Sequence, residues 1–433
     1  MSLPKNCLYT NKINSSYARQ FMSVIQPQNG NDAVLGDTII FNIPTGNNLV
    51  MSGHDTVLKF DLTIKANAAG NAANTVFLNK GGAHACFQRM RIFHGGSLLS
   101  DIDQYANLMD MLVVSQQSAD ILLTKYGILA GTNLGGGSPI AILAANAEIT
   151  YSYCVPLVSI LTLTNNYVPL FAMSGSPLRI ELQVVSSINQ IVKSLVQVVV
   201  PTAKSLISKC ELVCNLIELS DTGMGIVKNA IGSTSPLQWV TQDYRNYGSN
   251  VALGTSETSV SVPVPAKFNS LNSLFFTFRS NAGGASRLIH ANESCNFGLS
   301  EYFLRIGSKT MPVKPPNTIP EFYSELLRSF GTVSDINHEC GISSAQYEKK
   351  IPADITAAET SQATGAFYVG MDLESYSNTS MDSVYTGTNT STDDIFFTPK
   401  FAGQQNAVNI RIDAYALFDQ LVLIQNGICT VNY

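Results

Sequence analysis

The most regular hydrophobic pattern in the chain lies in residues 55–65, DTVLKFDLTIK. Its even positions are apolar from Leu58 to Ile64, whereas its odd positions include Lys59 and Asp61. This period of two predicts a half-buried antiparallel strand with one wet face. We predict further short strands, separated by turn residues, at residues 38–43, 48–51, 148–155, 166–171, 177–185, 191–200, 208–219, 258–264, 270–279, 407–417 and 421–431.

A second pattern, in residues 87–112 (FQRMRIFHGGSLLSDIDQYANLMDML), combines two periods. Apolar residues first alternate with Arg89 and Arg91, and a Gly-Gly pair and a second short strand follow. The last nine residues have apolar side chains at helical spacing. Asp103 precedes them, and its carboxylate is predicted to cap the first free N–H groups of the helix.

Residues 302–331 repeat this strand–turn–helix order in a weaker form, with Arg305-Ile306-Gly307 in the strand and turn, and Pro320 in the first helical turn. A second similarity relates the strand-like segments 177–182 and 408–413, which both contain Arg-Ile followed by an acidic residue. Both pairs are offset by roughly half the chain, which favours an internal duplication.

The remaining segments predict the domain organisation. Residues 1–34 are predicted to form an arm, with one short amphipathic helix that presents Tyr17, Phe21, Met22 and Ile25; a frayed terminus is the alternative. We expect a first domain at 35–219, a linker at 220–234 and a second domain at 235–433. Residues 128–146 and 375–394 are predicted to be long loops.

Composition narrows the class of protein. Only 13% of the 433 residues are charged, against about 25% in ordinary soluble domains. No run of about 18 apolar residues predicts a transmembrane helix. Two explanations of the low charge remain open. Part of the surface could be buried in contacts with other chains, or the protein could be a large β-protein whose loops are polar but uncharged. The net charge of −5 argues against electrostatic binding of nucleic acid by the protein surface as a whole.

Cysteine usage indicates a reducing environment. The eight cysteines form no Cys-x-x-Cys pair, and we predict that most are buried free thiols (Cys7, Cys86, Cys154, Cys210, Cys214, Cys295, Cys340 and Cys429). The first twelve residues contain no apolar signal-peptide core. We therefore expect a protein that is made inside a cell and not secreted.

Several residues were weighed as catalytic or ligand-binding. Asp221-Thr222-Gly223 is the aspartic-protease tripeptide, but that chemistry needs two such carboxylates and no second copy exists. Asp101 and Asp103 have the spacing of a cation site, although helix capping is the favoured role. The five histidines have no metal-binding spacing (His54, His84, His94, His290 and His338).

Two further features are given structural roles. The glycine-rich residues 131–137 lack the Lys-Ser/Thr of a phosphate loop, so a plain loop is expected. Trp239, the sole tryptophan, is expected in the core. The sequence thus predicts no catalytic, cofactor-binding or metal-binding residue, no cofactor and no enzyme.

The order of these motifs resembles a known family. A strand ending in RIFHGG, a helix of the type DIDQYANLMDML and the later segment VPLFAMSGSPLRIELQV together resemble double jelly-roll major capsid proteins. These proteins occur in polinton-like viruses, virophages, tectivirus-like phages and large DNA viruses. The second half departs from the pattern, because it contains the proline-rich segment 312–316 and no PLF segment.

The resemblance implies an all-β fold with two consecutive eight-stranded antiparallel jelly rolls and a few short helices in loops. It implies a capsid protein of the virion shell, whose homotrimers form pseudo-hexagonal tiles of an icosahedral shell around a DNA genome. Neighbouring capsomers and penton and minor capsid proteins would be its partners, with no sequence-specific nucleic acid. The alternative is a β-sandwich binding protein of lectin-like or fibre type, without catalytic activity.

Overall fold

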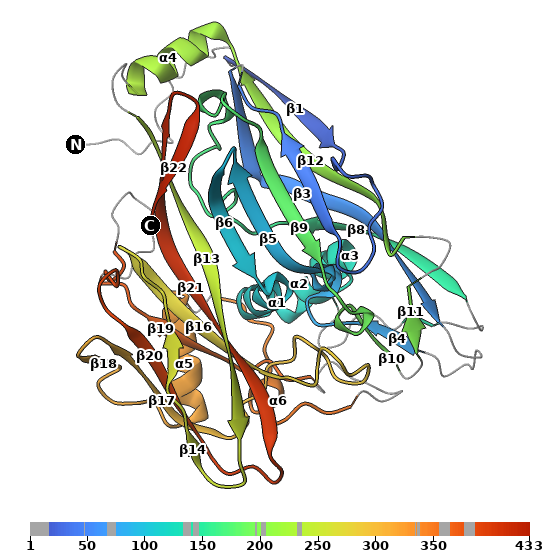
Figure 1. The fold of residues 1–433 in the computed structure, drawn as a ribbon, viewed down its shortest axis with the longest axis vertical. Helices are drawn as coiled ribbons and strands as arrows, with labels where there is room; N and C mark the ends of the chain where they lie inside the picture. Colours follow the sequence, from blue (N-terminus) through green and yellow to red (C-terminus); the bar gives the residue numbers. More distant parts are fainter. Residues whose placement is uncertain are drawn as a thin grey trace, which may run out of the picture.

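The computed structural model describes residues 17–46, 48–66, 75–132, 140–141, 147–194, 197–200, 205–231, 236–333, 335, 338–354, 364–375 and 386–433. Two β-barrels lie side by side in it (Figure 1). The first is drawn in blue to green, and the second in yellow to red. Helix α4 (Asp221–Ile231) lies in the connection between them.

The first barrel is built from eight principal strands, which form two facing sheets. In chain order these are β1 (Ala18–Ile25), β2 (Thr38–Ile43), β3 (Leu49–Ala66), β5 (Phe87–His94), β6 (Ser97–Asp103), β8 (Glu148–Pro156), β9 (Leu178–Val184) and β12 (Ile207–Leu219). One sheet has the order β1-β12-β3-β8 and the other β2-β9-β5-β6. If the strands are counted one to eight, these orders are 1-8-3-6 and 2-7-4-5.

The second barrel repeats the same strand orders. Its strands are β13 (Leu237–Leu253), β14 (Thr258–Ser259) with β15 (Val262–Val264) in second position, β16 (Leu271–Ser280), β17 (Leu299–Ile306), β18 (Lys309–Met311), β19 (Tyr368–Asp372), β20 (Ile395–Phe401) and β21 (Val408–Gln425). They pair as β13-β21-β16-β19 and β14/β15-β20-β17-β18. Eight positions in these two orders define a jelly roll, so the predicted double jelly roll is confirmed.

Short elements complete the sheets. β4 (Thr75–Leu78), β7 (Ile140–Ala141) and β10 (Val192–Ser194) form a small third sheet beside the first barrel. β11 (Val198–Val199) pairs antiparallel with the end of β3, and β22 (Ile428–Asn432) forms a hairpin with β21.

The helices follow the fifth strand of each barrel. After β6 come α1 (Tyr105–Gln116), α2 (Ala119–Leu123) and α3 (Lys125–Ala130); after β18 come α5 (Ile319–Ser329) and α6 (Ser344–Tyr347). The Thr318 side chain accepts a hydrogen bond from the Glu321 N–H, and Pro320 stands in the first turn of α5. The predicted repeat of strand, turn, strand and helix is therefore confirmed, at equivalent places in the two barrels.

Several predictions about local structure are wrong. The predicted strands 407–417 and 421–431 are in fact one long strand, β21, followed by a turn and β22. Residues 128–130 of the predicted loop 128–146 belong to α3. Residues 18–25 form neither a helix nor part of a free arm, because β1 pairs along its whole length with β12 and belongs to the first barrel. Residues 166–171 contain one isolated bridge, at Val168, and not a strand. Residues 191–200 are divided between β10 and β11, which lie in different sheets.

The second predicted sequence repeat is also wrong. Segment 177–182 belongs to β9, the seventh strand of its barrel, whereas segment 408–413 belongs to β21, the eighth. The Arg-Ile-acid pattern is short, and what the two strands share is a partly buried arginine followed by two buried residues. The true equivalent of β9 is β20.

Each barrel has an apolar interior formed by the inward faces of its two sheets. Aromatic rings dominate the second barrel: Phe276 stacks on Phe397 with ring centres 3.7 Å apart, and Phe268 stacks on Phe418 at 3.8 Å. Each such pair adds about 0.5–1.5 kcal/mol beyond the area that it buries. Ring stacking thus adds to the apolar packing that holds the second barrel together.

Candidate functional site: the seam between the barrels

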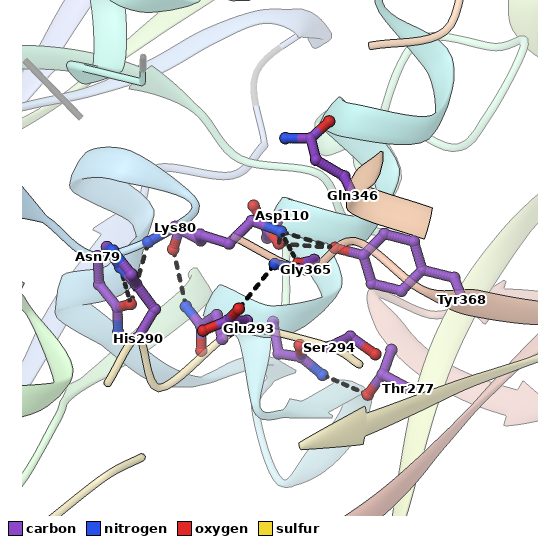
Figure 2. A network of polar contacts seen from close by, with 12 residues as sticks. Asn79, Lys80, Asp110, Thr277, His290, Glu293, Ser294, Gln346, Gly365 and Tyr368 are labelled. Atoms are coloured by element: carbon purple, nitrogen blue, oxygen red, sulfur yellow. Dashed lines mark hydrogen bonds and ion pairs between the residues drawn. The ribbon is translucent and has the colours of Figure 1, made fainter. Parts of the chain in front are cut away.

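The contact between the two barrels, called the seam below, is rich in buried polar groups. The loops that join the third and fourth strands of the two barrels meet there. The His290 ring lies 3.1 Å from Asn79 Oδ1, and the Asn292 amide donates to the Lys80 carbonyl oxygen at 2.9 Å. Equivalent loops of the two barrels thus bind each other directly (Figure 2).

A buried ion pair lies at the centre of the seam. Lys80 Nζ is 3.2 Å from Asp110 Oδ2 on α1, and the two side chains are only 3% and 2% exposed. The second barrel supplies the other partners, because Lys80 Nζ donates to Gly365 O at 2.7 Å and the Tyr368 hydroxyl donates to Asp110 Oδ2 at 2.8 Å (Figure 2). Burial and the nearby Asp110 charge raise the pKa of the Tyr368 hydroxyl well above its ordinary value, so it remains a donor.

Helix α1 is fixed to the second barrel at its beginning. The Asn107 amide donates to Thr277 Oγ1 at 2.8 Å and to the Tyr415 hydroxyl at 2.9 Å. Gln104, which precedes the helix in a left-handed conformation (φ 51°), accepts hydrogen bonds from Arg279 and from Tyr415. The unusual backbone of Gln104 is therefore held by residues of the other barrel.

Further along the seam, β6 lies beside β13. Ser100 Oγ donates to Asp243 Oδ1 at 2.8 Å, while Asp243 Oδ2 is buried without a hydrogen-bond partner among the described residues. Burial raises the pKa of Asp243 to about 7, against the smaller opposing effect of the Ser100 hydrogen bond. The carboxyl group is thus protonated more readily than an exposed aspartate.

A buried amine crosses the seam at its other end. Lys193 Nζ, on β10, donates to the carbonyl oxygens of Gly283 at 3.0 Å and Ser286 at 2.7 Å, both in the second barrel. Burial lowers the pKa of Lys193 to about 7, and Glu293 opposes this shift. The two barrels are therefore joined by neutral and charged hydrogen bonds along the whole seam.

A small cavity of about 30 Å³ lies in the seam, lined by Lys80, His84, Asp110, Thr132 and Gln346 among others. This volume holds about one or two water molecules. The seam has no space for an organic substrate at this point.

The candidates weighed from the sequence lie apart from one another. Asp221 begins α4 and accepts a hydrogen bond from the Asn48 side chain at 3.2 Å, at an exposed position. Asp101 accepts two hydrogen bonds from Arg89 at 2.7 and 2.6 Å, and Asp103 lies 3.8 Å from Arg411. The predicted capping role of Asp103 is wrong, because Gln104 occupies the N-cap of α1 and no side chain caps it.

The histidines and cysteines have structural environments. Each histidine contacts an oxygen atom of a different segment: His54 that of Thr164, His84 of Pro156, His94 of Met173, His290 of Asn79 and His338 of Ser115. All seven cysteines among the described residues are free thiols, and five of them are buried. Cys7 and residues 133–137 of the predicted 131–137 loop lie outside the described residues.

Trp239 is buried as predicted, and its place is informative. It lies on β13, and its indole N–H donates to Thr164 Oγ1 of the first barrel at 3.2 Å.

No helix among the described residues has the length and apolar character needed to span a membrane. Within the same part of the chain, no group of three or more His, Cys, Asp or Glu side chains is arranged to hold a metal ion.

Sequence reasoning missed the seam residues as a group. Lys80 and Asp110 are separated from Gly365 and Tyr368 by more than half of the chain, and nothing in the local sequence links them. The one available signal was a lysine within an otherwise apolar and small-residue segment, at residues 75–86. A lysine there is expected to need a buried partner.

Comparison with known proteins identifies the fold. No protein-family model matches the chain, and no curated protein matches it. Among solved structures, PBCV-1 VP54, fitted into a reconstruction of the virophage Sputnik, is 12% identical, covers 98% of this chain and 99% of its own, and has a TM-score of 0.64. The Faustovirus major capsid protein is 10% identical, covers 97% of this chain and 92% of its own, and has a TM-score of 0.61. The mavirus major capsid protein is 11% identical, covers 100% of this chain and 95% of its own, and has a TM-score of 0.57. The likeness in fold extends over nearly the whole chain, and therefore over both barrels.

Proposed function

We propose that this chain is a viral major capsid protein, located in the shell of the virion. The observation that supports the proposal most strongly is the similarity of both barrels together, over at least 97% of this chain, to the capsid proteins of PBCV-1, Faustovirus and mavirus. A single β-sandwich of lectin-like or fibre type would account for one barrel only. The capsid interpretation is therefore favoured over the binding-protein alternative.

The proposed role is structural and not catalytic. Two jelly rolls of the same strand order are joined by a buried polar seam, so the molecule has two similar halves. Three copies around a three-fold axis would present six similar barrels, which is the shape of a pseudo-hexagonal tile. We propose that such homotrimers contact neighbouring capsomers, together with penton and minor capsid proteins, around a DNA genome.

The first experiment is light scattering of the purified protein over a concentration series. The proposal predicts a stable trimer, three times the 46.7 kDa chain mass, that grows into sheets or shells as the concentration rises. A monomer whose mass does not change with concentration would contradict the proposal and favour the binding-protein alternative.

A further inference from the structure

The seam is a head-to-tail contact between two similar barrels. The first barrel presents its fifth strand, β6, and the second barrel presents β13, with β21 and β22 beside it (Figure 1). Both barrels stand the same way up. Equivalent loops, at Asn79 and His290, meet at one end of the seam, whereas Gly175 and the turn at Gly427 meet at the other. Each barrel thus uses a different one of its faces in the seam.

The counterparts of these two faces lie outside the seam. β18 is the fifth strand of the second barrel, as β6 is of the first, and β1 is the first strand of the first barrel, as β13 is of the second. β18 lies on the side of the second barrel that faces away from the first, and β1 on the side of the first that faces away from the second (Figure 1). A contact between the β18 side of one copy and the β1 side of the next would therefore repeat the seam, and head-to-tail contacts of this kind generate rings.

One place in the seam has an identifiable equivalent in the second barrel. Beside the turn between β5 and β6, a methyl group on Gly95 would lie 3.2 Å from Ser176 Oγ. Beside the turn between β17 and β18, a methyl group on Gly307 would lie 3.0 Å from Asp393 Oδ1. Ser176 and Asp393 each stand two residues before the seventh strand of their barrel. The two places are therefore equivalent.

The place in the first barrel is filled by the second barrel. The Gly175 N–H donates to Gly427 O at 3.1 Å, in the turn between β21 and β22. A methyl group on Gly427 would lie 2.9 Å from Ser174 Oγ, so the hairpin fits closely against this loop. The equivalent place in the second barrel is an open pocket of about 510 Å³. Its lining includes Lys309, Met311, Asn389 and Asp393.

We propose that this pocket receives a second copy of the chain, namely the end of its β12 together with the beginning of its β1. The proposal rests on the proposed capsid function, since it assigns the contact to the trimer. The end of β12 is the counterpart of the end of β21, which leads into the hairpin that fills the place in the first barrel. β1 begins at the same point, because Ala18 pairs with Leu219.

Charge also favours this occupant. Arg19 and Glu218 form an ion pair at 3.0 Å near the ends of β1 and β12, and their side chains are 77% and 47% exposed. The pocket presents one charge of each sign, on Lys309 and Asp393. Glu218 of one copy would meet Lys309 of the next, while Arg19 would meet Asp393. Complementary charges of this kind select the partner and its register. The exposed ring of Tyr17 adds apolar surface beside them.

The test reverses the charges on each side and leaves the net charge of the chain unchanged. Lys309→Glu/Asp393→Lys reverses the pocket, and Arg19→Glu/Glu218→Lys reverses the strand ends while their own ion pair is kept. Like charges would then face each other, so we expect the concentration at which the trimer dissociates to rise at least about tenfold in each variant. The quadruple variant should regain the wild-type trimer. Light scattering measures the mass, and Trp239 fluorescence shows that each chain is folded.

Mixing the two reversed variants tests that the ring has three members. In any mixed ring of three, two contacts join opposite charges but one still joins like charges. A 1:1 mixture should therefore form fewer trimers than the quadruple variant does. Full recovery in the mixture would contradict a contact that closes a ring of three.

Cross-linking tests the same contact in the wild-type protein. A carbodiimide should join Lys309 of one copy to Glu218 of another, and mass spectrometry of mixed light and heavy chains shows whether the link is between copies. We expect the link in the trimer and not in the monomer. Its absence from the trimer would overturn the pairing of these two residues.

Lys400→Glu/Glu257→Lys is the matched control. It reverses an exposed ion pair of 3.0 Å, and Lys400 lies at the end of β20 remote from Asp393. This variant should keep the wild-type trimer. If the wild type is a trimer and both reversed variants hold it as tightly, or if the quadruple variant regains nothing, the docking is wrong while the capsid function stands. A wild type that is only monomeric contradicts the capsid function itself.

Discussion

Replacement of Lys80 by Met tests whether the seam holds the two barrels together. The substitution keeps most of the side-chain volume but removes the cation from a pair whose members are 3% and 2% exposed. Asp110 would keep the Tyr368 hydrogen bond, yet its charge would be buried without a counter-charge, and Gly365 O would lose its 2.7 Å donor. Breaking a buried pair in this way costs about 3–5 kcal/mol. This corresponds to a factor of roughly 150 or more in the folding equilibrium.

The sole tryptophan provides the assay. Trp239 is buried in the seam and bonded to Thr164 of the other barrel, so its fluorescence reports when the barrels separate. We expect its denaturant transition to shift to lower urea concentration in Lys80→Met by an amount equivalent to about 3–5 kcal/mol. The double variant Lys80→Met/Asp110→Leu should recover a large part of this loss, because it removes both charges together.

Lys314→Met is the matched control, since Lys314 is 79% exposed and 3.5 Å from Glu321. An exposed pair of this kind contributes little to stability, because water and salt screen its charges. The reasoning is refuted if Lys80→Met lowers stability no more than Lys314→Met does, or if the double variant is less stable than Lys80→Met alone.

The remaining predictions concern pH and packing. Because the pKa of Asp243 is raised from its usual 3.8 to about 7, its contribution to stability is complete below pH 3.8, falls as the pH rises above that value and is lost once the pH has passed through about 7. Asp243→Asn should flatten the decline in Trp239-monitored stability between about pH 4 and 7, and an unchanged slope would contradict this assignment. Gly370→Ala should lower the free energy of unfolding, measured by heat or denaturant, by about 1–3 kcal/mol. The reason is that the new methyl group would lie 2.8 Å from Ser329 Cβ and 3.0 Å from Leu326 Cα on α5. In the matched variant Gly225→Ala, where no atom lies within 4 Å, stability should be equal or higher; equal losses in both variants would refute the packing argument.

The parts of the fold that could be predicted from the sequence are those that local patterns determine. The strand, turn, strand and helix in residues 87–112, and their repeat in residues 302–331, follow from alternation, a Gly turn and helical spacing. The double jelly roll came from the order of these motifs and the family resemblance. Neither required knowledge of any contact between distant segments.

The errors arose where a distant partner decided the outcome. In β1, the spacing of Tyr17, Phe21 and Ile25 is compatible with a helix, but β12 offers a complete antiparallel partner and the strand prevails. At α1, Asp103 has the right chemistry for a cap, yet bonds from Arg279 and Tyr415 hold Gln104 in that position. The seam could not be predicted for the same reason, because its residues converge only after both barrels have folded.

The two first strands, β1 and β13, occupy the same position in their barrels but differ in their surroundings. The outer edge of β13 is closed within the chain: its Gln242 N–H donates to Leu163 O at 2.9 Å, and Ser100 of β6 binds Asp243. β1, by contrast, is the last strand in the order of its sheet among the described residues, and its paired neighbour is β12. The two halves of the molecule are therefore not interchangeable although their strand orders agree: the first strand of the second barrel is committed to contacts within the chain, whereas the first strand of the first barrel ends its sheet.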